Sequence, residues 1–219
     1  MNVGILVFPG SNCNQDLKNA LDSLGVQTRF LWYNNQIEGS FDLLCVPGGF
    51  SYGDYLRSGA LASRSRVMSE LEAANNNGVP ILGICNGFQV LTESKLLPGA
   101  LLKNDNLRHI CKDVALTGCG LFGTGTFNNY KLPVSHSEGN YFCDEDSLRD
   151  LVNNEQIFFK YKNNVNGSIE RIAGISNREK NVFGLMPHPE RAFFKTQDRP
   201  ERSQGQQFFE QLFNVMNIA

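Results

Sequence analysis

The pentapeptide at residues 83–87, GICNG, constrains this chain more than any other feature. It follows a short apolar run at 79–82 and precedes a helix-like stretch at 88–91. Glycine two residues before and two residues after a reactive side chain is the pattern of a nucleophile elbow, where a strand ends, the chain turns sharply and a helix begins. Bulk at either flanking position would clash with neighbouring backbone. The pattern predicts a strand–turn–helix unit with Cys85 on a strained turn.

Two interpretations of Cys85 remain open at this point. At the start of a helix, a thiol meets the partial positive charge of the helix N-terminus, which favours the thiolate. Free cysteine is also among the most buried residue types, so the same five residues could enclose a structural cysteine. The chain has six cysteines without the CxxC spacing of a metal site, and its length does not suit a small disulfide-rich domain. We expect five of them to be structural and one to be chemically active.

Length and charge narrow the class of protein. The 219 residues suffice for one sizeable α/β domain, and we expect a single domain over residues 1–219. A net charge of −2, without a basic run, predicts no nucleic-acid and no membrane partner. The apolar stretch at 3–8 has no basic residues before it and is broken by Pro-Gly, so we expect a first strand and no signal peptide. These features predict a cytoplasmic protein.

Buried strands alternate with helices through the first hundred residues. Continuous apolar runs predict strands at 4–8, 26–32, 41–46 and 79–82. Helical spacing predicts a helix that ends at Gly25, a second over 59–74, and a third directly after the elbow. This alternation is typical of an α/β fold: an open, mostly parallel sheet with helices on both faces.

The second half of the chain has a different character. Residues 101–135 are rich in glycine, threonine and short β-type runs, with a turn at 128–129, which predicts an antiparallel β insertion. After it we expect a short helix, two paired strands, one further strand and a last helix, at 146–151, 157–162, 169–175, 182–186 and 203–216.

A cysteine nucleophile needs a base, and the base needs a group that orients it. Two of the three histidines are followed at i+2 by glutamate, in His136-Ser137-Glu138 and His188-Pro189-Glu190. We prefer His188 and Glu190 because prolines on both sides of His188 favour an extended backbone, and because the segment follows a strand. The alternative is a plain loop histidine beside prolines. For His136 we expect a structural or rim role.

Acyl transfer also needs donors for the oxyanion that develops in the transition state. Residues 47–49, Pro-Gly-Gly, end a buried strand with unshielded N–H groups, so Gly49 is one candidate donor. The N–H of Asn86, directly after the nucleophile, is the other donor that elbow geometry predicts. The glycines could also form no more than a tight turn at the end of the strand.

Taken together, the segments 47–49, 83–89 and 187–191 resemble the triad-type (class I) glutamine amidotransferases. Three more segments narrow the resemblance to the stand-alone glutaminase subunits of phosphoribosylformylglycinamidine synthase, an enzyme of purine biosynthesis: FPGSNC at 8–13, GGFSYGDYLR at 48–57 and PVSHSEG at 133–139. The similarity covers nearly the whole chain. Asn104 to Thr126 match the family pattern loosely, and Ser137 stands where the family more often has glycine.

The resemblance implies an activity and a division of labour. Cys85, His188 and Glu190 would form the triad that hydrolyses L-glutamine through a thioester, Gly49 and Asn86 would hold the oxyanion, and Gln89 would contact the substrate. Ammonia would pass to a large synthetase subunit, which converts formylglycinamide ribonucleotide to the amidine, and a third small subunit could join the assembly. ATP and Mg²⁺ would bind that partner, and we expect neither a cofactor nor a metal in this chain.

Two rival functions fit parts of the same pattern. A cysteine hydrolase or peptidase on a related α/β fold would also use an elbow cysteine, and would be indifferent to glutamine. A non-catalytic regulatory module could retain the fold, and its function would survive the loss of Cys85. A complete set of cysteine, histidine and glutamate argues against the second rival.

Overall fold

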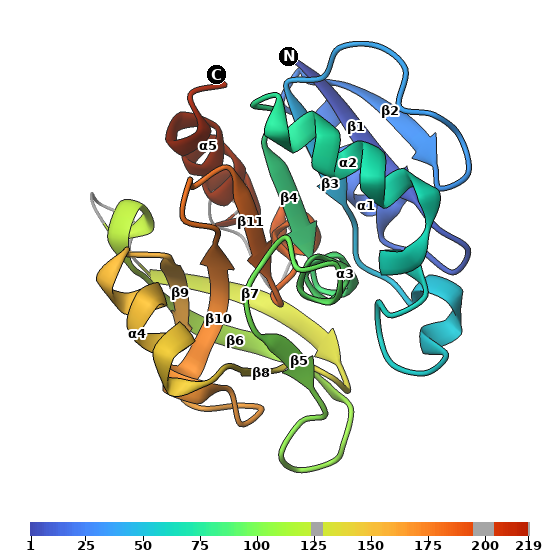
Figure 1. Cartoon of the computed structure of the whole chain (residues 1–219). Coiled ribbons are helices and arrows are strands. Elements are labelled where there is room, and N and C mark those ends of the chain that lie inside the picture. Colours follow the sequence, from blue (N-terminus) through green and yellow to red (C-terminus); the bar gives the residue numbers. More distant parts are fainter. Residues whose placement is uncertain (124–128, 195–203, 219) are drawn as a thin grey trace.

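The computed structural model describes residues 1–123, 129–194 and 204–218. One sheet of nine strands runs through these residues (Figure 1). Its strands lie in the order β2 (Gln27–Trp32), β1 (Asn2–Val7), β3 (Leu43–Val46), β4 (Ile81–Ile84), β11 (Val182–Leu185), β10 (Ile172–Ser176), β9 (Ile157–Tyr161), β6 (Ile110–Gly118) and β7 (Asn129–His136).

The first five strands in that order are parallel and form the half of the sheet that carries the elbow. They are flanked by helices α1 (Asn14–Asp22), α2 (Arg66–Asn76), α3 (Asn86–Glu93) and α5 (Gln204–Met216). Helix α2 lies in front of β1 and β3 in Figure 1, and α3 lies beyond the end of β4. Strands β3 and β4 are buried along their whole length, as the continuous apolar runs predict. The predicted α/β architecture is confirmed.

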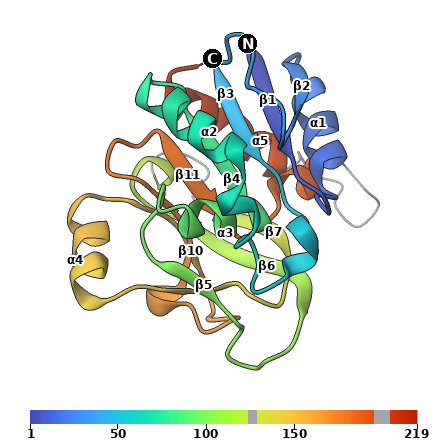
Figure 2. The ribbon, with the colours of Figure 1, turned by 45° about the vertical axis from the view of Figure 1, so that its right-hand side comes forward.

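The other half of the sheet is antiparallel. Strand β10 pairs antiparallel with both β11 and β9, and β6 pairs antiparallel with β9 and β7. Beside it lie the two-stranded sheet of β5 (Ala100–Leu102) and β8 (Asn140–Phe142), and helix α4 (Glu145–Asn153) (Figure 2). The predicted antiparallel region therefore extends the main sheet. The backbone N–H of His188 donates to the Pro133 carbonyl at 2.8 Å, which brings β7 against the segment that follows β11.

One helix begins later than its sequence predicts. The apolar spacing favours a helix from residue 59, but α2 begins at Arg66, after Ser65 in extended backbone (φ −70°, ψ 153°). Two short 3-10 helices, Ser51–Asp54 and Ala62–Arg64, precede it. The predicted positions Asn128 and Ser203 lie outside the described residues. Within those residues, no helix combines the length and apolarity that crossing a membrane requires.

Candidate active site

Cys85 joins β4 to α3 in a backbone conformation that non-glycine residues rarely adopt, with φ 51° and ψ −104°. The flanking glycines are there because neighbouring atoms leave no space. A Cβ on Gly87 would lie 1.9 Å from the Val46 carbonyl oxygen, and one on Gly83 would lie 2.5 Å from a Leu91 methyl group. The strand–turn–helix geometry that the pentapeptide predicts is therefore present, with Cys85 at its apex.

His188 and Glu190 form a buried pair directly after β11. Nδ1 of His188 lies 2.6 Å from Oε1 of Glu190, and both residues are 2% exposed. A Cβ on Gly48 would lie 2.7 Å from Cε1 of His188, so the imidazole lies close to the Gly48 backbone and leaves no space for a side chain there. The proline-bracketed segment and the i+2 spacing thus bring carboxylate and imidazole together, and the ring lies against the loop that ends β3.

The surroundings favour a charged His188. Burial alone would lower the pKa of this imidazole, but the Glu190 carboxylate and the nearby thiols of Cys85 and Cys13 outweigh burial, and the pKa rises well above its usual value. Nε2 of His188 is buried and has no hydrogen-bond partner of standard geometry among the described residues. The two thiols therefore act on the ring at longer range, and Nε2 is available to a bound substrate.

Cys13 is a second thiol beside the imidazole, and sequence reasoning missed it. Its sulfur lies within 4.8 Å of ligand atoms of His188 and Glu190, and in the described residues this trio is the cluster of His, Cys and carboxylate groups close enough to hold a metal ion. Cys13 follows β1, and its N–H donates to the Gly48 carbonyl at 3.2 Å. The signal was the position of residues 9–13 after a strand next to β3, because carboxyl ends of neighbouring parallel strands share one edge.

The two thiols differ in their backbone conformation. Cys85 occupies the strained apex that leads into a helix, whereas Cys13 has an unstrained backbone (φ −94°, ψ 8°) at the start of α1. The Cys85 sulfur lies 3.7 Å from the Ser135 carbonyl, and that of Cys13 lies 3.3 Å from the Asn12 amide oxygen. The elbow geometry favours Cys85 as the nucleophile.

The two candidate oxyanion donors come from adjacent loops. Gly49 (φ 145°) ends the loop after β3, and a Cβ there would lie 2.7 Å from the Asn12 backbone nitrogen. Its loop pairs with residues 9–13 through an isolated bridge between Ser11 and Gly49. Asn86 is the first residue of α3, where N–H groups have no acceptor within the helix. Both remain candidates for the oxyanion site.

Gln89 lies one turn into α3, and its side chain is held at both ends. Nε2 donates to the Glu138 carbonyl at 2.6 Å, and Oε1 accepts from the Asn86 side chain at 3.0 Å. The Asn86 amide oxygen in turn accepts the Ser51 N–H at 3.3 Å. A contact of Gln89 with substrate stays a prediction, and its bonds place it as a link between α3 and the segment 135–139.

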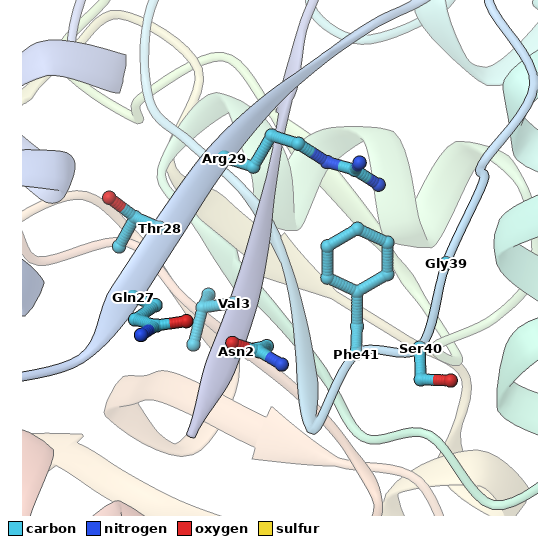
Figure 3. A pocket seen from close by; sticks show the side chains of 8 residues that line it. All are labelled: Asn2, Val3, Gln27, Thr28, Arg29, Gly39, Ser40 and Phe41. Carbon is cyan, nitrogen blue, oxygen red and sulfur yellow. The ribbon is translucent and has the colours of Figure 1, made fainter.

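One hollow on the surface lies away from these residues. Figure 3 shows this hollow of about 290 Å³ at the start of β1 and β2, lined by Asn2, Val3, Gln27, Thr28, Arg29, Gly39, Ser40 and Phe41. Its one charged side chain, Arg29, lies over the Phe41 ring at 4.9 Å. Parallel strands carry their sites at the opposite, carboxyl ends, so this hollow lies away from the sheet edge that bears Cys85.

Known proteins resemble this chain along nearly its whole length. The sequence family described as the CobB/CobQ-like glutamine amidotransferase domain matches residues 1–216. A phosphoribosylformylglycinamidine synthase subunit PurQ from Prochlorococcus marinus (strain MIT 9312) is 52% identical over 201 residues, 89% of this chain and 90% of the relative. The PurQ subunit of Prochlorococcus marinus subsp. pastoris is 52% identical over 197 residues, 87% of this chain and 89% of that protein.

A solved structure agrees with these sequence relatives. The structure of PurLQS from Thermotoga maritima contains a chain that superposes with a TM-score of 0.86 at 38% identity, covering 98% of both chains. The likeness therefore extends over the parallel and the antiparallel halves of the fold.

Proposed function

The chain belongs to the family of CobB/CobQ-like glutamine amidotransferase domains, and from this membership we propose that it is the glutaminase subunit of phosphoribosylformylglycinamidine synthase. It hydrolyses L-glutamine to glutamate and ammonia, and the ammonia serves a synthetase subunit that makes formylglycinamidine ribonucleotide. The names of the PurQ relatives and of the PurLQS complex support both the activity and the partner.

The proposed first step is acylation of Cys85. Its thiolate attacks the side-chain carboxamide carbon of glutamine, and the oxyanion accepts hydrogen bonds from the N–H groups of Gly49 and Asn86. The C–N bond then breaks, the His188 imidazolium gives its proton to the leaving nitrogen, and ammonia departs. A γ-glutamyl thioester remains on Cys85. The buried ion pair of His188 with Glu190 supports this role because it holds the imidazolium ready as an acid.

Deacylation uses the same groups in the opposite direction. Neutral His188 takes a proton from water, the hydroxide adds to the thioester, and the C–S bond breaks to release glutamate and restore the thiolate. Glu190 accepts the Nδ1–H of His188 throughout, which leaves Nε2 as the atom that exchanges the proton. The 2.6 Å bond between the two side chains supports this assignment.

The chain works in a complex with its synthetase subunit. We also propose that ATP and Mg²⁺ bind to the synthetase subunit, that a third small subunit joins the assembly, and that the reaction takes place in the cytoplasm. The chain acts as one glutamine amidotransferase domain over residues 1–219. The cluster of Cys13, His188 and Glu190 is interpreted as part of the catalytic surroundings because it contains the ion pair that the reaction needs.

The observation that carries the proposal is the strained elbow with Cys85 beside a buried histidine–carboxylate pair. The test is covalent labelling of the purified chain by an electrophilic glutamine analogue, read by intact mass and peptide mapping, with and without the synthetase subunit. One adduct on Cys85, suppressed by L-glutamine, is expected. Cys85→Ala should abolish the adduct, and the matched variant Cys13→Ala should retain it.

Two results would contradict the proposal. An adduct on Cys13 in place of Cys85 would move the nucleophile to the other thiol. A wild-type complex that leaves glutamine unhydrolysed, while its folded state is verified by circular dichroism, would remove the glutaminase function itself.

A further inference from the structure

Asn104 lies in the stretch that matches the family pattern loosely, and yet its side chain is fully buried and fully bonded. Nδ2 donates to the carbonyls of Arg108 at 2.8 Å and His136 at 2.9 Å. Oδ1 lies 3.1 Å from both the Gly139 nitrogen and Nδ1 of His136. A primary amide has two donors and two acceptor sites, so this side chain uses its whole capacity inside the protein.

These bonds also determine where the proton of His136 resides. Two carbonyl oxygens face one end of the Asn104 amide, and a backbone N–H faces the other, so the amide nitrogen and oxygen can be assigned in one way only. Oδ1 is an acceptor, and Nδ1 of His136 must therefore carry the proton. Burial lowers the pKa of His136 to about 4, and repulsion from His188 and His109 adds to this, so its Nε2 bears a lone pair at neutral pH.

Asn104 forms hydrogen bonds with one short stretch of backbone, the segment 135–139. Its own N–H donates to the Ser137 carbonyl at 2.9 Å, and its side chain holds the His136 carbonyl and the Gly139 N–H. Three consecutive peptide units of that backbone are thus held by a single residue. A Cβ on Gly139 would lie 2.3 Å from the His136 ring, which shows how closely the segment folds over its histidine.

The segment 135–139 lines one side of the proposed reaction site. At one end the Ser135 carbonyl lies 3.7 Å from the Cys85 sulfur, and at the other the Glu138 carbonyl accepts from Gln89 at 2.6 Å. A glutamine bound at Cys85 would therefore lie next to the Ser135 carbonyl, and the same segment is joined to α3 through Gln89. The positions of both carbonyls depend on the peptide units that Asn104 holds.

We propose that Asn104 is a positioning residue of the glutaminase site, which places glutamine against Cys85 by fixing the segment 135–139. The inference rests on the proposed function and adds to it a residue that touches neither the substrate nor the triad. Loss of the amide should disturb the seating of glutamine more than the reactivity of the thiol, because the Cys85 elbow and the His188–Glu190 pair are built from other elements.

The test compares Asn104→Ala with Gln156→Ala in the complex with the synthetase subunit. Gln156 is a matched control because its buried amide also donates to a backbone carbonyl, that of Ser176 at the end of β10, at 2.8 Å. Gln156 directly precedes β9 and does not contact the segment 135–139 through that bond. For Asn104→Ala we expect kcat/KM for glutamine to fall about tenfold or more, and alkylation of Cys85 by iodoacetamide to stay within about threefold of wild type. Gln156→Ala should change neither by more than about twofold.

A second readout follows the histidine directly and needs no activity. Nitrogen-15 NMR of the full chain should show His136 protonated on Nδ1 in the wild type and in Gln156→Ala, and on Nε2 or on a mixture of both in Asn104→Ala. Asn104→Asp keeps an acceptor for Nδ1 and places a carboxylate beside it, so it should keep the proton on Nδ1 and favour the His136 imidazolium. It should still lose kcat/KM, because it cannot donate to the two carbonyls.

The outcomes separate the two proposals. If the wild-type complex hydrolyses glutamine and Asn104→Ala matches Gln156→Ala in kcat/KM, the role of Asn104 is refuted and the glutaminase function stands. If alkylation of Cys85 falls as much as kcat/KM, Asn104 acts on the thiol and not on the seating of glutamine, which also overturns the inference. If the wild-type complex is inactive, the proposed function fails first and the role of Asn104 fails with it.

Discussion

The segments 135–139 and 187–191 carry the same three-residue pattern, histidine followed two residues later by glutamate, and the structure uses it in opposite ways. In both, the imidazole is buried, 3% exposed for His136 and 2% for His188, and lies against a glycine backbone. His188 contacts its own glutamate at 2.6 Å, whereas His136 contacts the neutral amide of Asn104 at 3.1 Å. Similar sequence and similar burial thus produce one charged and one neutral histidine.

The hydrogen-bond partner, and not the burial, decides the charge of these imidazoles. Burial disfavours the protonated form of both. A carboxylate at hydrogen-bond distance more than compensates for that cost in His188, and a primary amide offers no such compensation to His136. A site that needs a protonated histidine as an acid must therefore bury a carboxylate beside it. A histidine with a supporting role stays neutral when its partner is uncharged.

Backbone geometry determines which partner each histidine meets. The proline after His188 keeps that residue in extended backbone (φ −106°, ψ 89°), but the chain then enters the 3-10 helix Pro189–Ala192, and this turn brings the Glu190 carboxylate to the imidazole. The expected extended run through Glu190 is therefore absent. In the segment 135–139 the chain leaves β7 after His136, and the Glu138 carboxylate accepts the backbone N–H of Ser58 at 3.0 Å. The same i+2 spacing thus pairs histidine with glutamate only where the turn directs the carboxylate back to the ring.

The largest effect on kcat should come from removing each imidazole in turn. His188→Gln should lower kcat for glutamine hydrolysis about a thousandfold or more, because the group that moves the proton is lost. His136→Gln should lower it about tenfold or less, because it removes a support of the segment 135–139. Steady-state glutaminase rates of the complex decide the matter, and equal losses in the two variants would contradict the division of roles.

The two glutamates give the next test. Glu190→Gln keeps the shape and removes the charge that stabilises the His188 imidazolium, so kcat should fall about a hundredfold to a thousandfold. Glu138→Gln still offers an oxygen to the Ser58 N–H, and its rate should stay within about fivefold of wild type. A pH–rate profile provides the control. Of the two variants, only Glu190→Gln should shift the part of the profile that follows the protonation of His188.

Much of this site could be predicted from the sequence, because its parts are local. The glycines around Cys85, the prolines around His188 and the i+2 spacing of Glu190 each act within a few residues, where steric rules suffice. The parallel half of the fold was predictable for the same reason: its buried strands are continuous apolar runs. The late start of α2 at Arg66 was not, because apolar spacing continues through the loop before it.

The remaining parts depend on contacts between distant residues. Cys13 reaches His188 across 175 positions of sequence, and Asn104 reaches His136 across 32. Nothing in the composition of either neighbourhood distinguishes these two residues from ordinary loop residues. Their roles become visible only when the order of the strands places the loop after β1 beside the loop after β3, and β7 beneath the elbow.

The neutral histidine should leave a signature in stability. The pKa of His136 is about 4 in the folded chain against about 6.5 unfolded, so below pH 6.5 the unfolded chain binds a proton that the folded chain does not. This contribution is fully present above pH 6.5 and should be lost as the pH falls to 4, by about 3 kcal/mol in all.

Urea unfolding of wild type and His136→Gln between pH 7.5 and 4 measures that term. The difference in unfolding free energy between the two proteins should shrink as the pH falls. Groups common to both cancel, including His188, whose raised pKa has the opposite sign and loses its contribution as the pH rises. A difference that does not vary with pH would mean that folding does not lower the pKa of His136, and the contrast between the two histidines would fail.

The smallest expected effect concerns the second thiol. Cys13→Ala removes a neighbour of His188 and leaves Glu190 and Cys85 in place, so the imidazolium should be retained and kcat should stay within about threefold of wild type. The limb of the pH–rate profile that reports His188 should move slightly to lower pH, because one of the groups that raise its pKa is gone. Cys13→Ser serves as the conservative control. A thousandfold loss in Cys13→Ala would show that proximity to the imidazole, and not the strained elbow, selects the nucleophile, whereas a small shift without loss of rate would show that the carboxylate suffices to keep His188 charged.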